Sequence, residues 1–295
     1  MRIGIDLGGT KIEVVAIGDD GSERLRHRVR TPAGDYAGTI EAIRSLVDEV
    51  ESKVGRGASI GVGTPGATDP VTGLLRNSNS VVLNGKPLGR DISERLGRTI
   101  RMANDANCLA LSEAIDGAGA GRHVVFAAIL GTGVGGGIAV DRQVVAGRNN
   151  IAGEWGHNHL PWSRGDEEPG PRCYCGKRGC LETFLCGPAF SAAFSTATGR
   201  LMTPREIAAA AQSGDDEASS ALSGYEDRLA RGLAAVVNII DPDVIVLGGG
   251  LSKISRLYEN VPSLIATYTI SPQVQVELVP AVHGDSSGVR GAAWL

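Results

Sequence analysis

The sequence contains few aromatic residues, no run of basic residues and no long apolar run. Aromatic residues make up 4% of the 295 residues, whereas there are 42 glycines, so we expect many tight turns and close backbone contacts. No apolar run reaches membrane-spanning length, because glycines interrupt the apolar stretch from Val124 to Val140. The net charge is −4, and nucleic acids and anionic membranes are therefore poor candidates for partners.

Cysteine is also scarce, but its spacing is informative. Three of the five cysteines lie in one short loop: Cys173, Cys175 and Cys180. With His157 upstream, they form a ligand set suited to a tetrahedral structural zinc. The alternative is a disulfide, but the odd cysteine count and a start without an apolar signal region point to a soluble protein of the reducing cytoplasm. Cys108 and Cys186, on apolar helical stretches, are expected to be packed thiols.

Hydrophobic patterns predict an α/β chain whose two halves open in the same way, with a strand, a turn containing Gly and Thr, and a second strand. Strands are expected at residues 2–7, 11–17, 24–30, 59–63, 99–103, 123–130, 137–140, 244–247 and 274–279. Helices are expected at residues 35–54, 91–96, 108–115, 188–198, 204–213, 216–240, 252–267 and from 287 onward. The small, flexible segment Gly117 to Arg122 is expected to be a domain boundary.

The two glycine-rich turns are candidate phosphate loops. Gly131-x-Gly133-x-x-Gly136 matches the dinucleotide fingerprint by letters, but a strand pattern follows it where the fingerprint requires a helix, so we reject that interpretation. The backbone N–H groups and threonine hydroxyls of two such turns can hold phosphate oxygens, with Lys11 as an added cation. The alternative is that both are tight turns only. The run Gly248–Gly250 either lets an adenine or ribose approach the backbone or is a plain strand-to-helix turn.

The tetrapeptide Asn104-Asp105-Ala106-Asn107 lies between an expected strand and an expected helix. Asp105 either caps that helix or serves as the general base of a phosphoryl transfer. Amide, imidazole and carboxylate side chains suited to the many hydroxyls of a sugar occur at Asn77, Asn79, Asn84, Asn104, Glu154, His157 and Glu182.

Six motifs together resemble the ROK family of sugar kinases and repressors: Asp6-Leu-Gly-Gly-Thr-Lys11, Gly63-Thr-Pro-Gly66, Asn104-Asp-Ala-Asn107, Gly131-Thr-Gly-Val-Gly135, Gly153-Glu-Trp-Gly-His157 and Cys173-x-Cys-Gly-x-x-Gly-Cys-x-Glu182. Within that family the likeness is to the bacterial fructokinases, also called mannokinases. Three further features carry that likeness: Asn77-Ser-Asn-Ser80, Tyr174 with Lys177, and the ending from His283 to Trp294.

The resemblance implies an α/β, actin-like ATPase (ribonuclease H-like) fold, with two lobes and the ATP and sugar cleft between them. The N-terminal lobe is expected at residues 1–118, with the helix at 287–295 packing back on it. The larger C-terminal lobe, at 119–286, is expected to carry the zinc loop. ATP, Mg²⁺ and a structural Zn²⁺ are the implied cofactors.

The family pattern also implies roles for single residues, with Asp105 as the catalytic base. The implied sugar ligands are Asn79, Asn104, Asp105, Glu154, His157 and Glu182. The implied ATP contacts are Asp6, Gly8, Gly9, Thr10, Lys11, Thr132, Gly133, Gly248 and Gly249. The implied zinc ligands are His157, Cys173, Cys175 and Cys180, although His159 offers a second imidazole. Two departures are Val82, where relatives often carry an aromatic residue, and the long segment from Trp162 to Arg172.

We therefore expect an ATP-dependent kinase that converts D-fructose, and also mannose, to the 6-phosphate. A glucokinase or an N-acetylhexosamine kinase of the same family is the alternative. A sugar-responsive repressor is disfavoured, because the first strand begins at residue 2 and leaves no room for a DNA-binding domain. A non-catalytic sugar sensor is disfavoured because Asp105 and both Gly-Thr turns are present. The expected partners are a hexose, ATP and a second copy of the chain.

Overall fold

The computed structural model describes residues 1–78, 80–284 and 287–295. The chain forms two compact units, each built from separate segments. The first comprises Met1–Gly121, Gly137–Gly153 and Asp285–Leu295, and the second comprises Arg122–Gly136 and Glu154–Gly284. This division assigns residues 137–153 to the first unit, whereas the expected lobes of 1–118 and 119–286 assign them to the second. The lobe boundaries therefore stay a prediction.

The first unit is built on a five-stranded sheet of order β3-β2-β1-β4-β7. Its strands are β1 (Arg2–Leu7), β2 (Lys11–Ile17), β3 (Glu23–Arg30), β4 (Ser59–Thr64) and β7 (Arg101–Asn104). The first three are antiparallel neighbours, and β1, β4 and β7 are parallel. A small hairpin of β5 (Ala67–Thr68) and β6 (Leu75–Arg76) lies between the expected strand at 59–63 and the expected helix at 91–96, where no element was predicted. Strands of two residues are too short to show a period.

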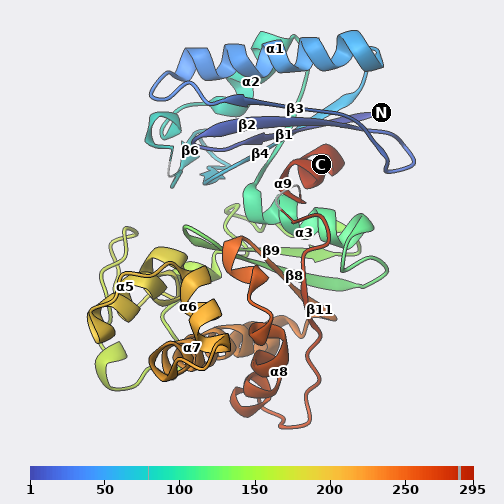
Figure 1. Ribbon diagram of the computed structural model, residues 1–295. Coiled ribbons are helices and arrows are strands. Elements are labelled where there is room, and N and C mark those ends of the chain that lie inside the picture. The colour runs from blue at the N-terminus through green and yellow to red at the C-terminus, as the bar shows by residue number, and fades with distance from the viewer. Residues whose placement is uncertain (79, 285–286) are drawn as a thin grey trace. The chain divides into compact units, whose positions relative to one another are not determined.

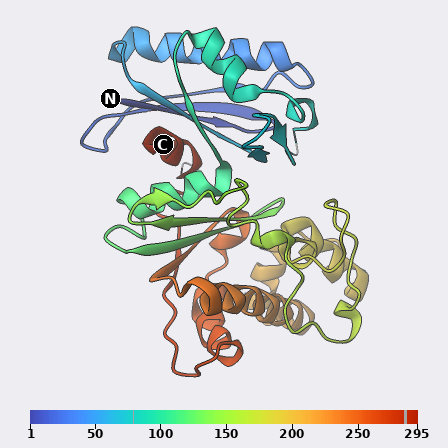
Figure 2. The ribbon, with the colours of Figure 1, turned by 180° about the vertical axis from the view of Figure 1, so that it is seen from behind.

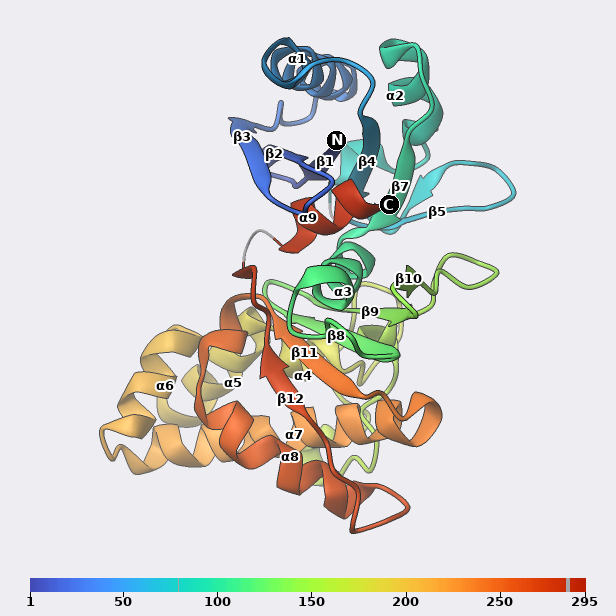
Figure 3. The same cartoon turned by 90° about the vertical axis from the view of Figure 1, so that its right-hand side faces the viewer.

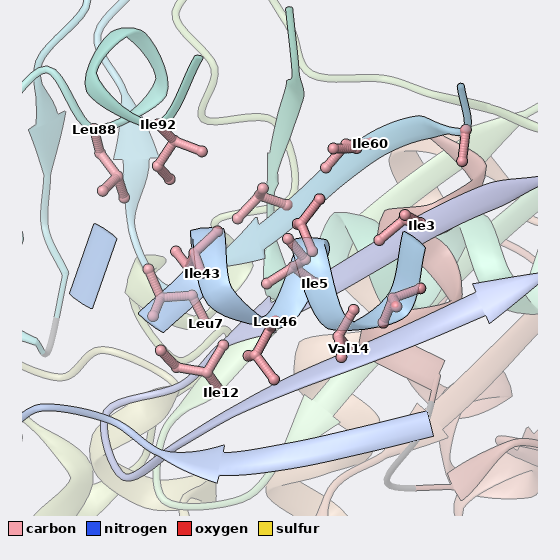
Figure 4. Packing of buried hydrophobic residues seen from close by; sticks show 14 of the residues in the cluster. Ile3, Ile5, Leu7, Ile12, Val14, Ile43, Leu46, Ile60, Leu88 and Ile92 are labelled. Atoms are coloured by element: carbon pink, nitrogen blue, oxygen red, sulfur yellow. The ribbon is translucent and has the colours of Figure 1, made fainter. Parts of the chain in front are cut away.

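Helices cover both faces of this sheet (Figures 1 and 3). α1 (Tyr36–Val54) and α2 (Leu88–Leu96) lie on one face, and α9 (Ser287–Trp294) lies on the other, where it packs against α3 (Asp105–Asp116). α1 begins where the side chain of Asp35 accepts a hydrogen bond from the Gly38 N–H. Because strand side chains alternate between faces, Ile3, Ile5 and Leu7 all point toward α1 and form the core shown in Figure 4.

The terminal helix α9 packs directly on strand backbones. A Cβ atom on Gly4 of β1 would lie 2.1 Å from the Val289 carbonyl oxygen, and one on Gly61 of β4 would lie 1.8 Å from that of Ala292. Only glycine permits such an approach. The last residues of the chain thus complete the core of the unit that contains the first residues.

The second unit contains the parallel strands β8 (Val124–Leu130), β11 (Val244–Gly248) and β12 (Leu278–Pro280). Its helices are α4 (Glu182–Leu185), α5 (Gly187–Thr198), α6 (Pro204–Gln212), α7 (Asp216–Ile240) and α8 (Arg256–Tyr268). α7 and α8 pack side by side (Figure 2). The remaining strands, β9 (Val134–Val140) and β10 (Gln143–Val144), form an antiparallel hairpin, and the order of the second sheet is β10-β9-β8-β11-β12.

Among the expected elements of this half, the two largest differences in bounds are at α8 and β12. The helix expected from residue 252 begins at Arg256, because a 3-10 turn at Gly250–Lys253 comes first. The strand expected at 274–279 is reduced to Leu278–Pro280, the residues that pair with β11. Among the described residues, no helix is long and apolar enough to cross a membrane.

Candidate functional site

In the first unit, polar side chains gather at the carboxyl edge of the parallel strands. The register pairs Asp6 of β1 with Gly63 of β4, and Thr64 of β4 with Asn104 of β7. In open α/β sheets, ligands bind at this edge, where consecutive strands present their last residues together. Asp6, Asn104 and Asp105 therefore belong to one candidate site, although they are distant in the sequence.

Asp105 is the first residue of α3, which begins three residues before the expected start. The N-cap is Asn104, whose Oδ1 accepts hydrogen bonds from the N–H groups of Ala106 at 2.7 Å and Asn107 at 3.3 Å. Because Asn104 supplies the cap, the alternative that Asp105 is the N-cap is wrong. The Oδ1 atom of Asp105 also accepts a hydrogen bond from the Ala106 N–H, at 2.8 Å. The helix start thus fixes this carboxylate in place.

Asp6 has the electrostatic environment of a functional acid. Burial raises its pKa to about 6, with further contributions from the nearby carboxylates of Asp105 and Glu13, while Lys11 and Arg28 act in the opposite direction. Two acids held close together in a desolvated place create a strong negative potential, which a cation or a transferring proton would relieve.

The first glycine turn, Gly8-Gly9-Thr10, joins β1 to β2. The Gly8 N–H donates to the Lys11 carbonyl at 3.0 Å. Thr31 holds the turn from outside, since its N–H donates to the Thr10 carbonyl and its hydroxyl donates to the Gly8 carbonyl at 2.7 Å. Lys11 Nζ lies 3.7 Å from a carboxylate oxygen of Glu13. Thr31 belongs to none of the sequence motifs, so the sequence does not indicate that it hydrogen-bonds to this turn.

The second turn, from Gly131 to Gly133, joins β8 to β9 in the second unit. Because β9 begins at Val134 and no helix follows, the rejection of a dinucleotide fingerprint is confirmed. Oε2 of Glu182 accepts the Val134 N–H at 2.9 Å. A Cβ atom on Gly133 would lie 2.7 Å from that oxygen. Glu182 therefore holds the turn as well as being a candidate sugar ligand, a role that sequence analysis missed.

The third glycine run lies beside the second turn. Gly249 has a φ of +83°, and a Cβ atom on it would lie 2.5 Å from the carbonyl oxygen of Leu130, the residue before Gly131. The open backbone conformation and the close approach both require glycine. Gly248 ends β11 and is buried. These contacts explain the glycines by packing, and contact with a nucleotide stays a prediction.

The four predicted zinc ligands lie together in the second unit. The ligand atoms of His157, Cys173, Cys175 and Cys180 all lie within 4.8 Å of one another. His157 Nδ1 is 3.5 Å from Cys173 Sγ, and the Sγ atoms of Cys175 and Cys180 are 3.6 Å apart. A disulfide bond is about 2.05 Å long, whereas a tetrahedral zinc holds its ligand atoms about 3.5–3.8 Å apart. The donor set therefore fits zinc, and all five cysteines are free.

His159 lies outside this group. Its Nδ1 is 3.1 Å from the Leu160 carbonyl oxygen, and its Nε2 is 3.7 Å from a carboxylate oxygen of Glu168. The ring also lies over Gly179, where a Cβ atom would come within 2.5 Å of Nε2. Cys108 and Cys186 are buried, as expected of packed thiols.

The outer nitrogen of His157 faces a tyrosine. His157 Nε2 lies 3.0 Å from the hydroxyl oxygen of Tyr174, and the two rings meet edge to face at 5.1 Å. Partial desolvation of its hydroxyl, with the nearby carboxylates of Glu182 and Glu154, raises the pKa of Tyr174 to about 12, although the residue as a whole is exposed. Burial also raises the pKa of Glu154, whereas His157 lowers it and Glu182 raises it. The predicted sugar ligands of this unit are thus brought near one another.

Trp155 anchors the segment that carries Glu154 and His157. Its indole N–H donates to the Gly135 carbonyl at 2.8 Å, and its ring meets Phe126 of β8 edge to face at 5.7 Å. Of the other predicted sugar ligands, Asn104 and Asp105 lie in the first unit, and Asn79 lies outside the described residues.

The long segment from Trp162 to Arg172 is attached to α7 by a buried ion pair. The Glu167 carboxylate accepts from Arg231 at 2.7 and 2.8 Å and from Arg228 at 2.8 Å. The Arg231 side chain is 1% exposed and also donates to the carbonyl of Trp162. At its other end, the segment reaches the cysteine loop, where the Gly179 N–H donates to the Pro171 carbonyl at 2.9 Å. The segment therefore links α7 to the cysteine loop.

Comparisons with known proteins agree with this architecture. A model of the ROK family matches residues 2–295. N-acetyl-D-glucosamine kinase of Vibrio cholerae is 38% identical over 299 residues, which cover 100% of this chain and 99% of that protein. N-acetyl-D-glucosamine kinase of Salmonella newport is 38% identical over 305 residues, which cover 100% of this chain and 99% of that protein.

Solved structures show the same likeness. The ROK hexokinase from Thermus thermophilus has a TM-score of 0.88 and 32% identity, covering 99% of this chain and 96% of that chain. A ROK family glucokinase from Streptomyces griseus, determined in complex with glucose and AMPPNP, has a TM-score of 0.80 and 27% identity, covering 99% of this chain and 97% of that chain. The expected actin-like ATPase fold is thereby confirmed.

Proposed function

Because this chain belongs to the ROK family, we propose that it is an ATP-dependent hexose kinase that phosphorylates D-fructose, and mannose second, on the 6-hydroxyl. The observation that carries the proposal is the placement of Asp105 beside Asp6 at the carboxyl edge of β1, β4 and β7. A carboxylate at that edge can serve as the general base, and the second carboxylate can hold the metal ion that accompanies ATP.

In the proposed reaction, Asp105 accepts the proton of the sugar hydroxyl while the hydroxyl oxygen attacks the γ-phosphorus of ATP. The new bond joins that oxygen to phosphorus, and the bond that breaks releases ADP. The cap made by Asn104 holds the carboxylate at the first turn of α3. A base held in position removes the orientational entropy that a free carboxylate would lose in the transition state.

The triphosphate is proposed to lie on the glycine turns, with backbone N–H groups, Thr10, Thr132 and Lys11 as donors. Asp6 would hold a magnesium ion, since its carboxylate lies beside a second one. Magnesium, when bound, offsets the charge of the triphosphate as the γ-phosphoryl group leaves.

Glu154, His157 and Glu182 are proposed to bind sugar hydroxyls from the second unit, and Asn104 from the first. Zinc, when bound by His157, Cys173, Cys175 and Cys180, holds the loop and the orientation of the imidazole ring. With Nδ1 of His157 directed at the cluster, Nε2 carries the proton that can be donated outward.

N-acetylglucosamine is the second candidate substrate. Relatives that are 37–38% identical over the whole chain are N-acetyl-D-glucosamine kinases. Fructose is favoured by sequence resemblance: Asn77 to Ser80, Tyr174 with Lys177, and the ending of the chain.

The deciding experiment is a coupled ADP-release assay on the zinc-loaded protein with Mg-ATP. Fructose, mannose, glucose and N-acetylglucosamine are compared by kcat/KM. The proposal expects fructose first and mannose second. A higher kcat/KM for N-acetylglucosamine would replace fructose with the second candidate, and the absence of sugar-dependent ADP release with all four would contradict a hexose kinase.

A further inference from the structure

The side chain of Tyr174 occupies a position that the proposed function assigns to substrate. Its hydroxyl oxygen lies 3.0 Å from Nε2 of His157. Nδ1 of the same ring points to Cys173 Sγ at 3.5 Å and so belongs to the cysteine cluster. Nε2 is the only ring nitrogen left for a sugar hydroxyl, and it has a single N–H to donate. Tyrosine and sugar therefore compete for one donor.

We propose that Tyr174 limits sugar affinity, because its hydroxyl stands in for a sugar hydroxyl on His157 and is displaced when the hexose binds. This inference rests on the proposed function, since it takes His157 as a sugar ligand. It adds a residue that sets affinity without taking part in the chemistry. The sugar has to match the tyrosine hydroxyl in position and hydrogen bonding, and a hexose that does not do so leaves Tyr174 in place.

The local structure suits a side chain that moves while its backbone stays. Tyr174 lies between two predicted zinc ligands, Cys173 and Cys175. The Cys173 N–H donates to the Lys177 carbonyl at 2.9 Å, and the Gly176 N–H donates to the Cys173 carbonyl at 3.0 Å. Tyr174 itself is 72% exposed. Rotating it away from His157 thus gives up one hydrogen bond and an edge-to-face ring contact, with little buried area lost.

The surroundings favour exchange with a sugar. The carboxylate of Glu154 lies near His157, and the carboxylates of Glu154 and Glu182 both lie near Tyr174. When the imidazole donates from Nε2, the tyrosine oxygen is the acceptor, as a sugar hydroxyl oxygen would be. A sugar that takes this place can also donate its hydroxyl protons to the carboxylates, whereas the tyrosine ring brings a single hydroxyl. Replacing the tyrosine hydroxyl by a sugar with several hydroxyl groups therefore gains more hydrogen bonds than it breaks.

The test replaces Tyr174 with phenylalanine, which keeps the ring and removes the competing hydroxyl. Sugar affinity is measured by titration calorimetry without ATP, and kcat and KM are measured with Mg-ATP. Since one hydrogen bond contributes about 1 kcal/mol, we expect Kd and KM for the accepted hexose to fall about fivefold, so that kcat/KM rises through KM. Tyr36→Phe is the matched control, because it removes the hydroxyl that donates to Asp91 in the first unit.

Each outcome decides the proposal. Tighter sugar binding in Tyr174→Phe, with zinc content unchanged and no change in Tyr36→Phe, supports it. Weaker binding makes Tyr174 a direct sugar ligand, and unchanged binding leaves it without a role in affinity; both results overturn the proposal. Tyr174→Leu, which removes the ring as well, is expected to shift Kd in the same direction. If the unmodified protein neither binds nor phosphorylates any hexose, the proposed function fails instead, and this is seen before any variant is compared.

Discussion

Replacing Glu167 with glutamine is expected to weaken the second unit, because it leaves a buried arginine without its principal counter-charge. The Glu167 side chain is 7% exposed and the Arg231 side chain 1%. The Glu167 carboxylate accepts hydrogen bonds from the guanidinium groups of Arg231 and Arg228. It also accepts one from the Arg164 N–H at 3.0 Å. Glutamine preserves the shape and one acceptor oxygen but removes the charge. Asp227 Oδ2 remains 3.1 Å from Arg231 Nε, so Arg231 keeps one of its two counter-charges. A buried charge that loses part of its compensation is destabilised.

The magnitude follows from the pKa of Glu167. Burial alone would raise this pKa, but hydrogen bonds from Arg231 and Arg228 lower it from 4.5 to about 2. At 1.36 kcal/mol per pKa unit, this corresponds to about 3 kcal/mol in favour of the folded state. Arg228 is 29% exposed, so solvent screens part of the interaction. We expect Glu167→Gln to lower the free energy of unfolding by about 2 kcal/mol at neutral pH.

The dependence on pH has a definite sign. Because the pKa of Glu167 is lower in the folded state, its contribution is complete above pH 4.5 and is lost as the pH falls toward 2. Urea unfolding at several pH values should therefore show a difference between variant and unmodified protein that shrinks across this window. Glu168→Gln is the matched control, since that neighbouring side chain is 53% exposed and is expected to change stability by less than about 0.5 kcal/mol. Equal stability of Glu167→Gln and the unmodified protein at pH 7 would refute the reasoning.

Three further predictions concern the metal, the product and the second turn. The purified, reduced protein is expected to contain one zinc per chain, and a chelator is expected to lower both its melting temperature and its sugar affinity; elemental analysis without zinc would contradict this. The product is expected to carry phosphate on the 6-hydroxyl in phosphorus–proton NMR, and a 1-phosphate would contradict the assigned geometry. Gly133→Ala is expected to displace the Glu182 carboxylate, because its Cβ would lie 2.7 Å from Oε2, and so to break the hydrogen bond from the Val134 N–H that holds the turn; the KM for ATP is expected to rise, and an unchanged KM for ATP would contradict the assignment of phosphate to this turn.

The sequence predicts local elements well where a period or a cap is present. The β1 and β2 hairpin and the whole of α7 have the predicted bounds, because alternation and helical spacing are local properties. α3 begins at Asp105, three residues before its expected start. Asn104 and Asp105 are both good capping residues, and only the observed hydrogen bonds show that Asn104 is the cap.

Contacts between residues that are far apart in the sequence are harder to predict from the sequence. The cysteine loop was predictable because its ligands are close in sequence and chemically distinctive. In contrast, the hydrogen bond from Val134 to Glu182, and that from Arg231 to Glu167, join residues 48 and 64 positions apart and leave no periodic trace. Gly4 and Gly61 pack against α9, near the end of the chain. Glycine in a strand indicates a close approach but does not identify the partner.

The most direct test of the account is the turnover of Asp105→Asn. Asn104 supplies the cap of α3, and asparagine at 105 can still accept the Ala106 N–H, so the helix is expected to form normally. The change also removes a negative charge that raises the pKa of Asp6, so no loss of stability is expected. We predict that kcat for the accepted hexose falls by about a hundredfold or more, with the Kd for that hexose nearly unchanged. Near-normal turnover would contradict the central claim that Asp105 is the general base of a hexose kinase.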